Sequence, residues 1–371
     1  MSDPMRVLIA GGGTGGHLYP GIALAEEITS RPGGEVLFVG TQRGLEAKVV
    51  PAAGYQLEVL EVSGIKRTGL RGLVKGLLKL PKAMLASRAI LQRYRPEMVV
   101  GVGGYASGPM VLMAALMGFP TAIQEQNSYP GFTNRVLGRF VQRVYVSFDE
   151  ARRFFKKRKI SMVGNPVRRT FVDNATRPWT GEARHLVVVG GSQGARAIND
   201  LVTGMAPLLM EKGELPPVLH QSGSNDYDRM RRRYDVLRVG PRVDLHPYIE
   251  DMPAVLARAS LVISRAGALT LAELAIVGCP AILIPLPTAS DDHQTRNAMA
   301  FQRAGAAIVL PQRETSAATL AKVVLDLLKD PSRLAAMATA MRSLGHSDAA
   351  RKIVDDFATV THFATGNRIA G

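Results

Sequence analysis

Two glycine-rich segments, one in each half of the chain, constrain its fold most. Residues 6–10 form a short apolar run that leads into Gly-Gly-Gly-Thr-Gly-Gly-His at residues 11–17. Residues 185–189 are a similar run and lead into Gly-Gly-Ser-Gln-Gly-Ala at residues 190–195. An apolar strand, a glycine turn and a helix are how a Rossmann-like domain begins. The sequence therefore predicts two such domains rather than a short-period repeat array.

The rest of each half alternates between strand and helix patterns. Helical spacing of apolar residues follows the first loop at Leu18, Ile22, Ala25 and Ile28. This alternation predicts parallel sheets covered on both faces, and 371 residues suit two α/β domains. The other predicted strands are residues 36–39, 98–102, 121–124, 144–147, 218–221, 261–264 and 281–285, and the other predicted helices are residues 269–276, 317–328 and 349–360.

The join between the domains is predicted near Gly-Asn-Pro-Val at residues 164–167. Pro166 keeps Asn165 out of the helical region, and residues 168–184 show little pattern. We therefore expect domains at 1–164 and 165–371. Whether the last helix packs back onto the first domain is left open. Residues from about 363 onward have no pattern and are expected to be loose.

The charge balance is unusually basic. Lys and Arg number 46 against 31 Asp and Glu, which gives a net charge of +15. Such an excess favours polyanionic partners, whether nucleic acid, anionic lipid or phosphorylated substrates. No apolar run approaches the roughly 20 residues that span a bilayer, no signal peptide is evident, and the single Cys279 excludes an internal disulfide. These features predict a cytoplasmic protein.

The first glycine loop is either a tight strand–helix turn or a ligand-binding loop. Five glycines in six positions exceed what a turn needs and suit close approach to a phosphate at a helix N-terminus. A dinucleotide fingerprint is weak here, because Gly40, Thr41 and Gln42 stand where a ribose-binding acid is expected after the next strand. No Gly-Lys-Ser/Thr closes a Walker loop. A lone histidine is more often structural, but His17 on this loop is a candidate general base.

A second glycine loop lies at residues 100–109, so the chain carries three such loops. Three exceed what one dinucleotide needs. They fit two phosphate-bearing ligands in a cleft between two domains, at the carboxyl ends of the strands.

Three polar segments follow predicted strands. Residues 124–127 (Gln-Glu-Gln-Asn) are either a plain loop or part of a site. Glu273 falls at the end of the first turn of a predicted helix, where it could favour the helix dipole or accept hydrogen bonds from ribose hydroxyls. Residues 291–297 could bind sugar hydroxyls, although Asp291 and His293 lack the spacing of a metal site. No Gly-x-Ser-x-Gly elbow supports acyl transfer.

Residues 70–85 form a basic amphipathic segment without acidic residues. It is either a core-facing helix with a solvated basic side or a surface that rests on anionic headgroups, where each Lys or Arg contributes roughly 1 kcal/mol. No aromatic residue lies in residues 57–91, which disfavours nucleic acid as the partner. The apolar face comprises Leu70, Leu73, Val74, Leu77, Leu78, Met84 and Leu85, and the basic face comprises Arg71, Lys75, Lys79 and Lys82.

Seven motifs in this order resemble the MurG family of bacterial peptidoglycan N-acetylglucosaminyltransferases. The resemblance covers about residues 6–345 and leaves out the tail, residues 168–184 and residues 227–238. The motifs are residues 12–17, 103–109, 125–127, 164–168, 190–195, 265–270 with Glu273, and 292–294.

The resemblance implies the GT-B fold, in which two Rossmann-like domains with parallel sheets face a cleft. The C-terminal domain is expected to hold UDP-GlcNAc, and the N-terminal domain is expected to hold the lipid-linked acceptor and associate with the membrane. The implied reaction is inverting transfer of GlcNAc to the muramyl 4-hydroxyl of undecaprenyl-pyrophosphoryl-MurNAc-pentapeptide, which converts lipid I to lipid II. The implied location is the cytoplasmic face of the cell membrane, as a peripheral protein, with cell-wall synthesis or division proteins as further partners. No cofactor and no metal are expected.

The resemblance also assigns residues. His17 is the expected base, with Glu125 in reserve. On the acceptor side it implies Thr14, Gly15, Gly16, Tyr105 and Asn127. On the donor side it implies Gly191, Ser192 and Arg168 for the phosphates, Ile249 for the uracil, Ala268, Leu269 and Thr270 for the diphosphate, Glu273 for the ribose and Gln294 for the GlcNAc hydroxyls.

Four other functions are alternatives. Another GT-B glycolipid synthase is the nearest. A UDP-GlcNAc 2-epimerase has no lipid acceptor and leaves the basic amphipathic segment unexplained. A non-catalytic sugar-nucleotide-binding subunit predicts loss of one set of loops, and both sets are intact. A nucleic-acid binder accounts for the charge but not for three glycine loops.

Overall fold

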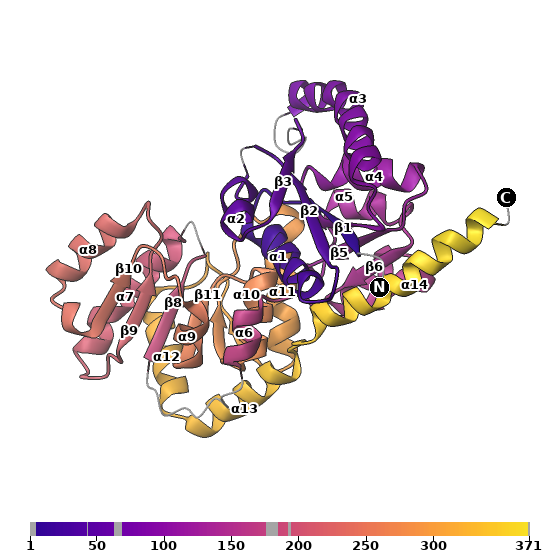
Figure 1. The fold of residues 1–371 in the computed structure, drawn as a ribbon. Coiled ribbons are helices and arrows are strands. Elements are labelled where there is room, and N and C mark those ends of the chain that lie inside the picture. The colour runs from indigo at the N-terminus through magenta and orange to yellow at the C-terminus, as the bar shows by residue number, and fades with distance from the viewer. Residues whose placement is uncertain (1–4, 43, 63–68, 176–184, 192–193, 370–371) are drawn as a thin grey trace. The chain divides into compact units, whose positions relative to one another are not determined.

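The computed structural model describes residues 5–42, 44–62, 69–175, 185–191 and 194–369, with the backbone alone for residues 69–79, 240, 290 and 362–369. The chain divides into two compact units (Figure 1). The first comprises Met1–Arg169 and His346–Gly371, and the second comprises Thr170–Gly345.

The sheet of the first unit contains seven strands among the described residues, all parallel. β1 lies at its centre, where Ile9 pairs with Phe38 of β2 on one side and Val100 of β4 on the other. The order β3-β2-β1-β4-β5-β6-β7 is that of a doubly wound Rossmann sheet. The strands are β1 (Arg6–Gly11), β2 (Glu35–Gly40), β3 (Gln56–Val59), β4 (Met98–Gly103), β5 (Thr121–Glu125), β6 (Arg143–Val146) and β7 (Ile160–Met162).

Helices cover both faces of this sheet because both faces of its central strands are apolar. Val7 and Ile9 pack into one core cluster, and Leu8 and Ala10 pack into another on the opposite face. Alternate residues of a strand point to opposite faces, so β1 contributes to both clusters. The helices of this unit are α1 (Gly15–Thr29), α2 (Glu46–Ala52), α3 (Gly69–Tyr94), α4 (Ser107–Leu116), α5 (Phe132–Leu137), η1 (Asp149–Phe154), η2 (Lys157–Lys159) and α14 (Ala349–Ile369).

The last helix, α14, belongs to the first unit and packs against α1 (Figure 1). Phe357 is buried in the core cluster that also contains Ile9. Asp356 forms an ion pair with Arg143 at 2.7 Å and accepts a hydrogen bond from the Tyr145 hydroxyl at 3.0 Å. No helix was predicted from about residue 363 onward, whereas α14 continues to Ile369.

The second unit repeats the same topology with six parallel strands among the described residues. Their order is β10-β9-β8-β11-β12-β13, again that of a Rossmann sheet. The strands are β8 (His185–Val189), β9 (Val218–Gln221), β10 (Val243–His246), β11 (Ala259–Ser264), β12 (Ala281–Leu283) and β13 (Ala307–Val309). The helices are α7 (Arg196–Met210), α8 (Tyr227–Val236), η3 (Gly240–Arg242), α9 (Met252–Ala257), α10 (Ala268–Val277), η4 (Ser290–Asp292), α11 (His293–Arg303), α12 (Ala317–Leu328) and α13 (Pro331–Ser343).

The predicted fold class, two parallel-sheet Rossmann-like domains, is confirmed. Within residues 168–184, where the sequence shows little pattern, a short helix α6 (Arg169–Asn174) forms and buries Phe171. No helix among the described residues combines the length and apolar character that crossing a bilayer requires.

Candidate functional site

In the first unit, the first two glycine loops meet where β1 and β4 end side by side. The Gly12 amide donates a hydrogen bond to the Gly103 carbonyl at 3.2 Å. Gly104 has φ +87°, and a Cβ placed on it would lie 2.3 Å from the Gly12 carbonyl oxygen. Only glycine permits this approach. This edge is the topological switch point of the sheet, where doubly wound folds bind their ligands.

His17 lies in the first turn of α1, and Thr14 is the N-cap of that helix. The imidazole packs on Gly103, where an added Cβ would lie 2.6 Å from Nδ1. Its Nδ1 is 3.2 Å from Oε1 of Gln126, and the residue is partly exposed. Thr14 and Gly16 are exposed, and Gly15 is partly so. The predicted base thus lies on the rim of the two joined loops.

Glu125, the reserve base, is buried at the end of β5. Its carboxylate accepts hydrogen bonds from the Asn127 amide at 2.9 Å, the Gly131 amide at 3.2 Å and Asn134 Nδ2 at 2.9 Å. Burial raises the pKa of Glu125, and these hydrogen bonds oppose the shift. The arrangement favours a carboxylate that positions Asn127 and the following turn, while a catalytic role stays a prediction.

Tyr105 and Arg168 were also predicted to contact substrate. The Tyr105 side chain lies in the second loop and is 50% exposed. Arg168 belongs to the first unit, and its guanidinium lies 4.5 Å from the ring centroid of Tyr19 on α1. This cation–π contact fixes the guanidinium against α1.

Glu46 is a residue of this region that the sequence analysis missed. Its buried carboxylate accepts hydrogen bonds from the Gly13 amide at 2.6 Å and from the Thr41 amide and hydroxyl at 2.8 and 2.7 Å. The Gly13 N–H is therefore directed at a carboxylate. An acid that binds ribose is expected directly after β2, whereas Glu46 reaches the loop from the first residue of α2.

The second unit holds a cavity of about 590 Å³ at its own switch point, where β8 and β11 end. Its volume is typical of a site for a small ligand. It brings together three of the predicted donor residues, Gly191, Thr270 and Gln294. Three arginines that were not assigned to the donor site also line it and supply positive charge, namely Arg196, Arg265 and Arg313. The remaining lining residues are Val189, Gly190, Gly194, Ala195, Ala197, Gly267, Leu286, Pro287, Thr288 and Gln312.

The third glycine loop forms one wall of this cavity. Gly191 and Gly194 have φ of +87° and +75°, and a Cβ on Gly194 would lie 2.0 Å from the Ser222 carbonyl oxygen. Ser192, predicted to bind the donor phosphates, lies outside the described residues.

The start of helix α10 also lines the cavity. Ala268, Leu269 and Thr270 form its first turn, and Gly267 is the N-cap. A helix N-terminus directs its N–H groups and its dipole at an anion. Thr270 lines the cavity, whereas Ala268 and Leu269 are buried beside it.

The sequence analysis expected Glu273 at the end of the first turn of its helix, and this expectation was wrong. Because α10 starts at Ala268, Glu273 falls in the second turn, and its side chain is buried. The helix dipole acts mainly within the first turn, so the dipole interpretation is weakened. The alternative, hydrogen bonding to ribose hydroxyls, stays a prediction.

Gln221, at the end of β9, connects two parts of the predicted donor site and was also missed. Its Nε2 donates to the Gly191 carbonyl at 3.1 Å, and its Oε1 accepts from the Ile249 amide at 2.9 Å. One side chain thus holds both the third glycine loop and the backbone at Ile249, the predicted uracil contact. Nothing in the local sequence marks Gln221, because both partners come from other loops.

Gln294 is the second residue of α11. Its Oε1 accepts a hydrogen bond from the Leu286 amide at 3.0 Å, which holds the loop after β12 against the cavity. Among the described residues, no group of three or more His, Cys, Asp or Glu side chains is arranged to hold a metal ion.

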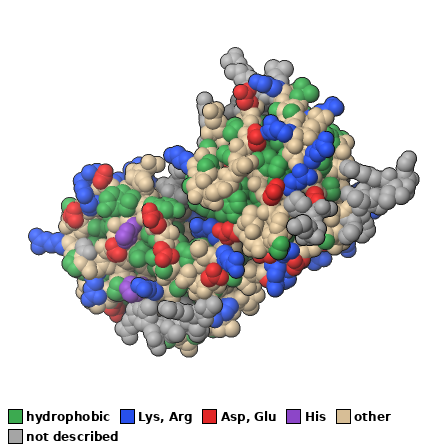
Figure 2. All heavy atoms as spheres, in the orientation of Figure 1, with side chains coloured by type: hydrophobic (Ala, Val, Ile, Leu, Met, Phe, Trp, Pro, Cys, Tyr) green, Lys and Arg blue, Asp and Glu red, His purple; other side chains and the backbone are tan. Residues whose placement is uncertain are grey.

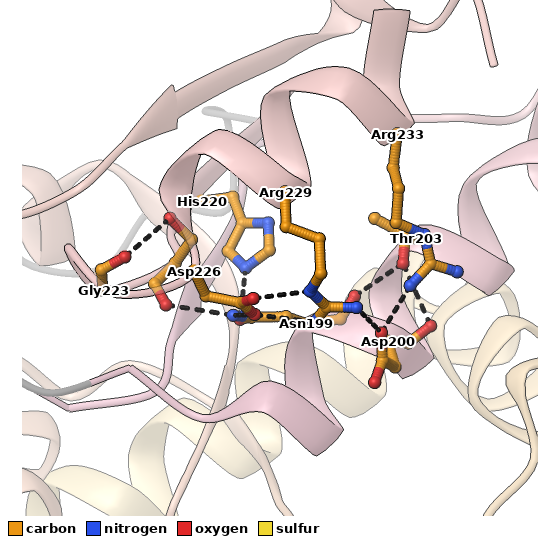
Figure 3. Close-up of polar contacts among 9 residues, drawn as sticks. Asn199, Asp200, Thr203, His220, Gly223, Asp226, Arg229 and Arg233 are labelled. Atoms are coloured by element: carbon orange, nitrogen blue, oxygen red, sulfur yellow. Dashed lines mark hydrogen bonds and ion pairs between the residues drawn. The ribbon is translucent and has the colours of Figure 1, made fainter. Parts of the chain in front are cut away.

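A partly buried polar network lies behind the third loop (Figure 3). Asn199 donates to the Ser222 carbonyl at 3.0 Å and to Asp226 at 2.6 Å, and its Oδ1 lies 2.9 Å from Nε2 of His220. Arg229 forms hydrogen bonds with both carboxylate oxygens of Asp226 and holds its pKa below the usual range. Burial lowers the pKa of His220 to about 4, so the ring is neutral. The network fixes Ser222, on which Gly194 packs.

Two family models match the chain and together cover most of both units. Residues 7–146 match the glycosyltransferase family 28 N-terminal domain, and residues 185–353 match the family 28 C-terminal domain. The chain belongs to glycosyltransferase family 28. The two matches correspond to the two Rossmann-like domains of a GT-B enzyme.

Relatives of the family-28 chain carry a specific name. A protein of Anaeromyxobacter sp. (strain Fw109-5) is 50% identical over 353 residues, which cover 95% of this chain and 92% of that protein. One from Myxococcus xanthus (strain DK1622) is 49% identical with the same coverage. Both are named UDP-N-acetylglucosamine–N-acetylmuramyl-(pentapeptide) pyrophosphoryl-undecaprenol N-acetylglucosamine transferase.

Solved structures agree with this placement of the family-28 chain. The crystal structure of Acinetobacter baumannii MurG has a TM-score of 0.78 and 28% identity, covering 96% of this chain and all of that one. A putative UDP-N-acetylglucosamine 2-epimerase from Listeria monocytogenes has a TM-score of 0.68 at 14% identity, covering 98% of this chain and 97% of that one. The latter likeness shows the fold alone.

Proposed function

We propose that this family-28 chain transfers N-acetylglucosamine from UDP-GlcNAc, with inversion, to the muramyl 4-hydroxyl of undecaprenyl-pyrophosphoryl-MurNAc-pentapeptide. The reaction converts lipid I to lipid II in peptidoglycan synthesis. The observation that carries the proposal is 50% identity, over 95% of the chain, to a transferase named for this reaction. The epimerase alternative has fold-level likeness only.

The donor is assigned to the cavity of the second unit. Gly191, Ser192 and the first turn of α10 contact the diphosphate, and Arg265 adds a positive charge in the cavity. Ile249 borders the uracil, Glu273 binds the ribose, and Gln294 binds the GlcNAc hydroxyls. The departing UDP gains negative charge in the transition state, and the α10 N-terminus, Arg265 and Arg168 stabilise that charge.

The acceptor is assigned to the joined loops of the first unit. Thr14, Gly15, Gly16, Tyr105 and Asn127 contact it. His17 removes the proton of the muramyl 4-hydroxyl as that oxygen attacks the anomeric carbon. A partly exposed imidazole on the rim of these loops suits this step. Glu125 acts through Asn127, whose amide groups it binds.

We further propose that the first unit rests on the cytoplasmic face of the cell membrane as a peripheral domain. Leu85 of α3 is 67% exposed and Leu116 of α4 is 65% exposed, and α3 packs against α4. Figure 2 shows hydrophobic side chains beside Lys and Arg side chains over the part of this unit that carries α3. Exposed apolar groups with adjacent cations suit an interface with anionic lipid.

The assignment of a basic face to α3 rests on the sequence. The side chains of Arg71, Lys75 and Lys79 lie outside the described residues. Lys82 is described and forms an exposed ion pair with Glu61 at 2.6 Å, which contributes little and is screened by salt. Cell-wall synthesis or division proteins are proposed as further partners on the family resemblance alone.

The transfer proposal is tested by incubating the protein with UDP-GlcNAc labelled in its sugar and a short-chain lipid I analogue. We expect label in a disaccharide-lipid product whose formation requires both substrates. Absence of that product in protein that binds UDP-GlcNAc would refute the assignment.

A further inference from the structure

Three buried side-chain amides form a line that ends at His17. Asn165, Gln124 and Gln126 are each at most 5% exposed. Gln124 Nε2 donates to Asn165 Oδ1 at 2.9 Å, and Gln126 Nε2 donates to Gln124 Oε1. Gln126 Oε1 then faces His17 Nδ1 at 3.2 Å. The proposed base is therefore connected to the interior of the first unit.

Backbone carbonyls fix which way the amides at both ends of this line point. Gln126 lies 2.8 Å from the Val102 carbonyl oxygen, which can only accept, so the Gln126 atom facing it must be Nε2. Asn165 Nδ2 donates to the Gln126 carbonyl at 3.1 Å, so the other end of that amide is Oδ1. Gln124 must then direct Nε2 to Asn165 and Oε1 to Gln126. Exchanging oxygen and nitrogen in any of the three amides would place two acceptors or two donors together.

These orientations determine the proton on His17. An amide oxygen accepts and cannot donate, so the hydrogen of this contact must be carried by Nδ1. In the neutral ring the lone pair then belongs to Nε2. The hydrogen bond made at one imidazole nitrogen sets the state of the other.

We propose that Gln126 is a positioning residue that holds neutral His17 in its Nδ1–H tautomer, which leaves Nε2 as the nitrogen that accepts the acceptor's proton. This rests on the proposed function for the role of His17 as base. The packing of Gly103 against the Nδ1 side of the ring directs Nε2 away from that loop. A neutral imidazole in water carries its proton mainly on Nε2, so the tautomer needed here is one that the protein must impose.

The tautomer can be read directly by long-range ¹H–¹⁵N NMR of the full chain labelled with ¹⁵N-histidine, at a pH where the ring is neutral. The chain has seven histidines, and the signal absent from His17→Gln identifies the relevant one. We expect His17 of the unaltered protein to show protonated Nδ1 and unprotonated Nε2. Observation of Nε2–H instead would overturn the proposal without any variant of Gln126.

Gln126→Leu removes the acceptor and nearly keeps the side-chain volume. We expect the His17 signal to shift toward the Nε2–H form and kcat to fall about tenfold or more, while the Kd for UDP-GlcNAc stays within twofold. Gln92→Leu, an exposed position at the end of α3, is the matched control and should change neither readout. An unchanged tautomer in folded Gln126→Leu would contradict the proposal. If Nδ1–H is observed but His17→Ala retains turnover, the tautomer assignment stands and the base in the proposed function is wrong.

Discussion

Three residues shape the candidate site although their side chains are buried and are not in contact with solvent. Glu46 and Glu125 direct their carboxylates at the backbone of loops in the first unit, and Gln221 bridges two segments of the second unit. A buried carboxylate or amide that is fully hydrogen-bonded orders the loop that it binds. These loops are therefore held in place before substrate arrives.

The role of His17 predicts a separation of binding from turnover. We expect His17→Ala to lower kcat by about 10²- to 10⁴-fold, the contribution typical of a general base, and to leave the Kd for UDP-GlcNAc unchanged. The donor cavity is lined by residues of the second unit, which explains the unchanged Kd. Steady-state kinetics and a binding titration measure the two quantities. Turnover within a few-fold of the unaltered enzyme would exclude His17 as the base.

Sequence motifs identified some of the residues that line the site but none of those that support it from behind. Gly191, Thr270 and Gln294 follow strands in recognisable motifs, and the structure brings them to one cavity. Gln221 and Glu46 could not be recognised, because their partners are distant in sequence and become neighbours only when the sheet forms.

At the scale of elements, the strands that the sequence analysis predicted and the strands that it missed occupy different positions in the two sheets. The four missed strands, β3, β7, β10 and β13, are the edges of the two sheets. Central strands of a parallel sheet are buried on both faces and read as continuous apolar runs, as β1 and β11 do. Edge strands are partly solvated, and β3, with the sequence Gln-Leu-Glu-Val, has no such run.

The network behind the third loop predicts a pH-dependent stability of the second unit. The pKa of His220 is lowered by burial from 6.5 to about 4, so the unfolded chain binds a proton that the folded chain does not between these values. Stability is then complete above about pH 6.5 and is lost as the pH falls toward 4. We expect His220 to account for a loss of roughly 2 kcal/mol between pH 7.5 and pH 5.

Urea unfolding at both pH values measures this loss, with His220→Gln as the reference that cannot titrate. The variant should be less stable at pH 7.5, because the contacts with Asn199 and Tyr234 are altered, but its decrease toward pH 5 should be smaller. Equal decreases in both proteins would show that His220 is not the group responsible.

Helix α3 carries the membrane proposal. Replacing Lys75, Lys79 and Lys82 by Glu should weaken binding to vesicles that contain anionic phospholipid, because each cation contributes roughly 1 kcal/mol near such a surface. Sedimentation with vesicles measures it. The control replaces exposed Arg231, Arg232 and Lys322 of the second unit by Glu, which changes net charge equally and should leave binding unchanged. Equal effects would point to net charge alone, and no effect in the α3 variant would favour a helix that only packs on the core.

For the whole molecule, two Rossmann sheets of the same order each place a glycine loop at a switch point. The repeated topology was predictable, because each half begins with the same strand, loop and helix pattern. The packing of α14 on the first unit was not predictable, because the spacing of its apolar residues indicates a helix but not the surface on which the helix packs. Ile353, Val354 and Phe357 pack in the core beneath α1.

The central claim, transfer of GlcNAc with inversion to a lipid-linked muramyl sugar, is tested most directly by the structure of the product. UDP-GlcNAc, whose sugar is α-linked, is incubated with a lipid I analogue and the product is analysed by NMR. We predict release of UDP and a disaccharide with a β linkage to the muramyl 4-oxygen. An α-linked product, a 2-epimerised sugar nucleotide or an unchanged acceptor would contradict this account.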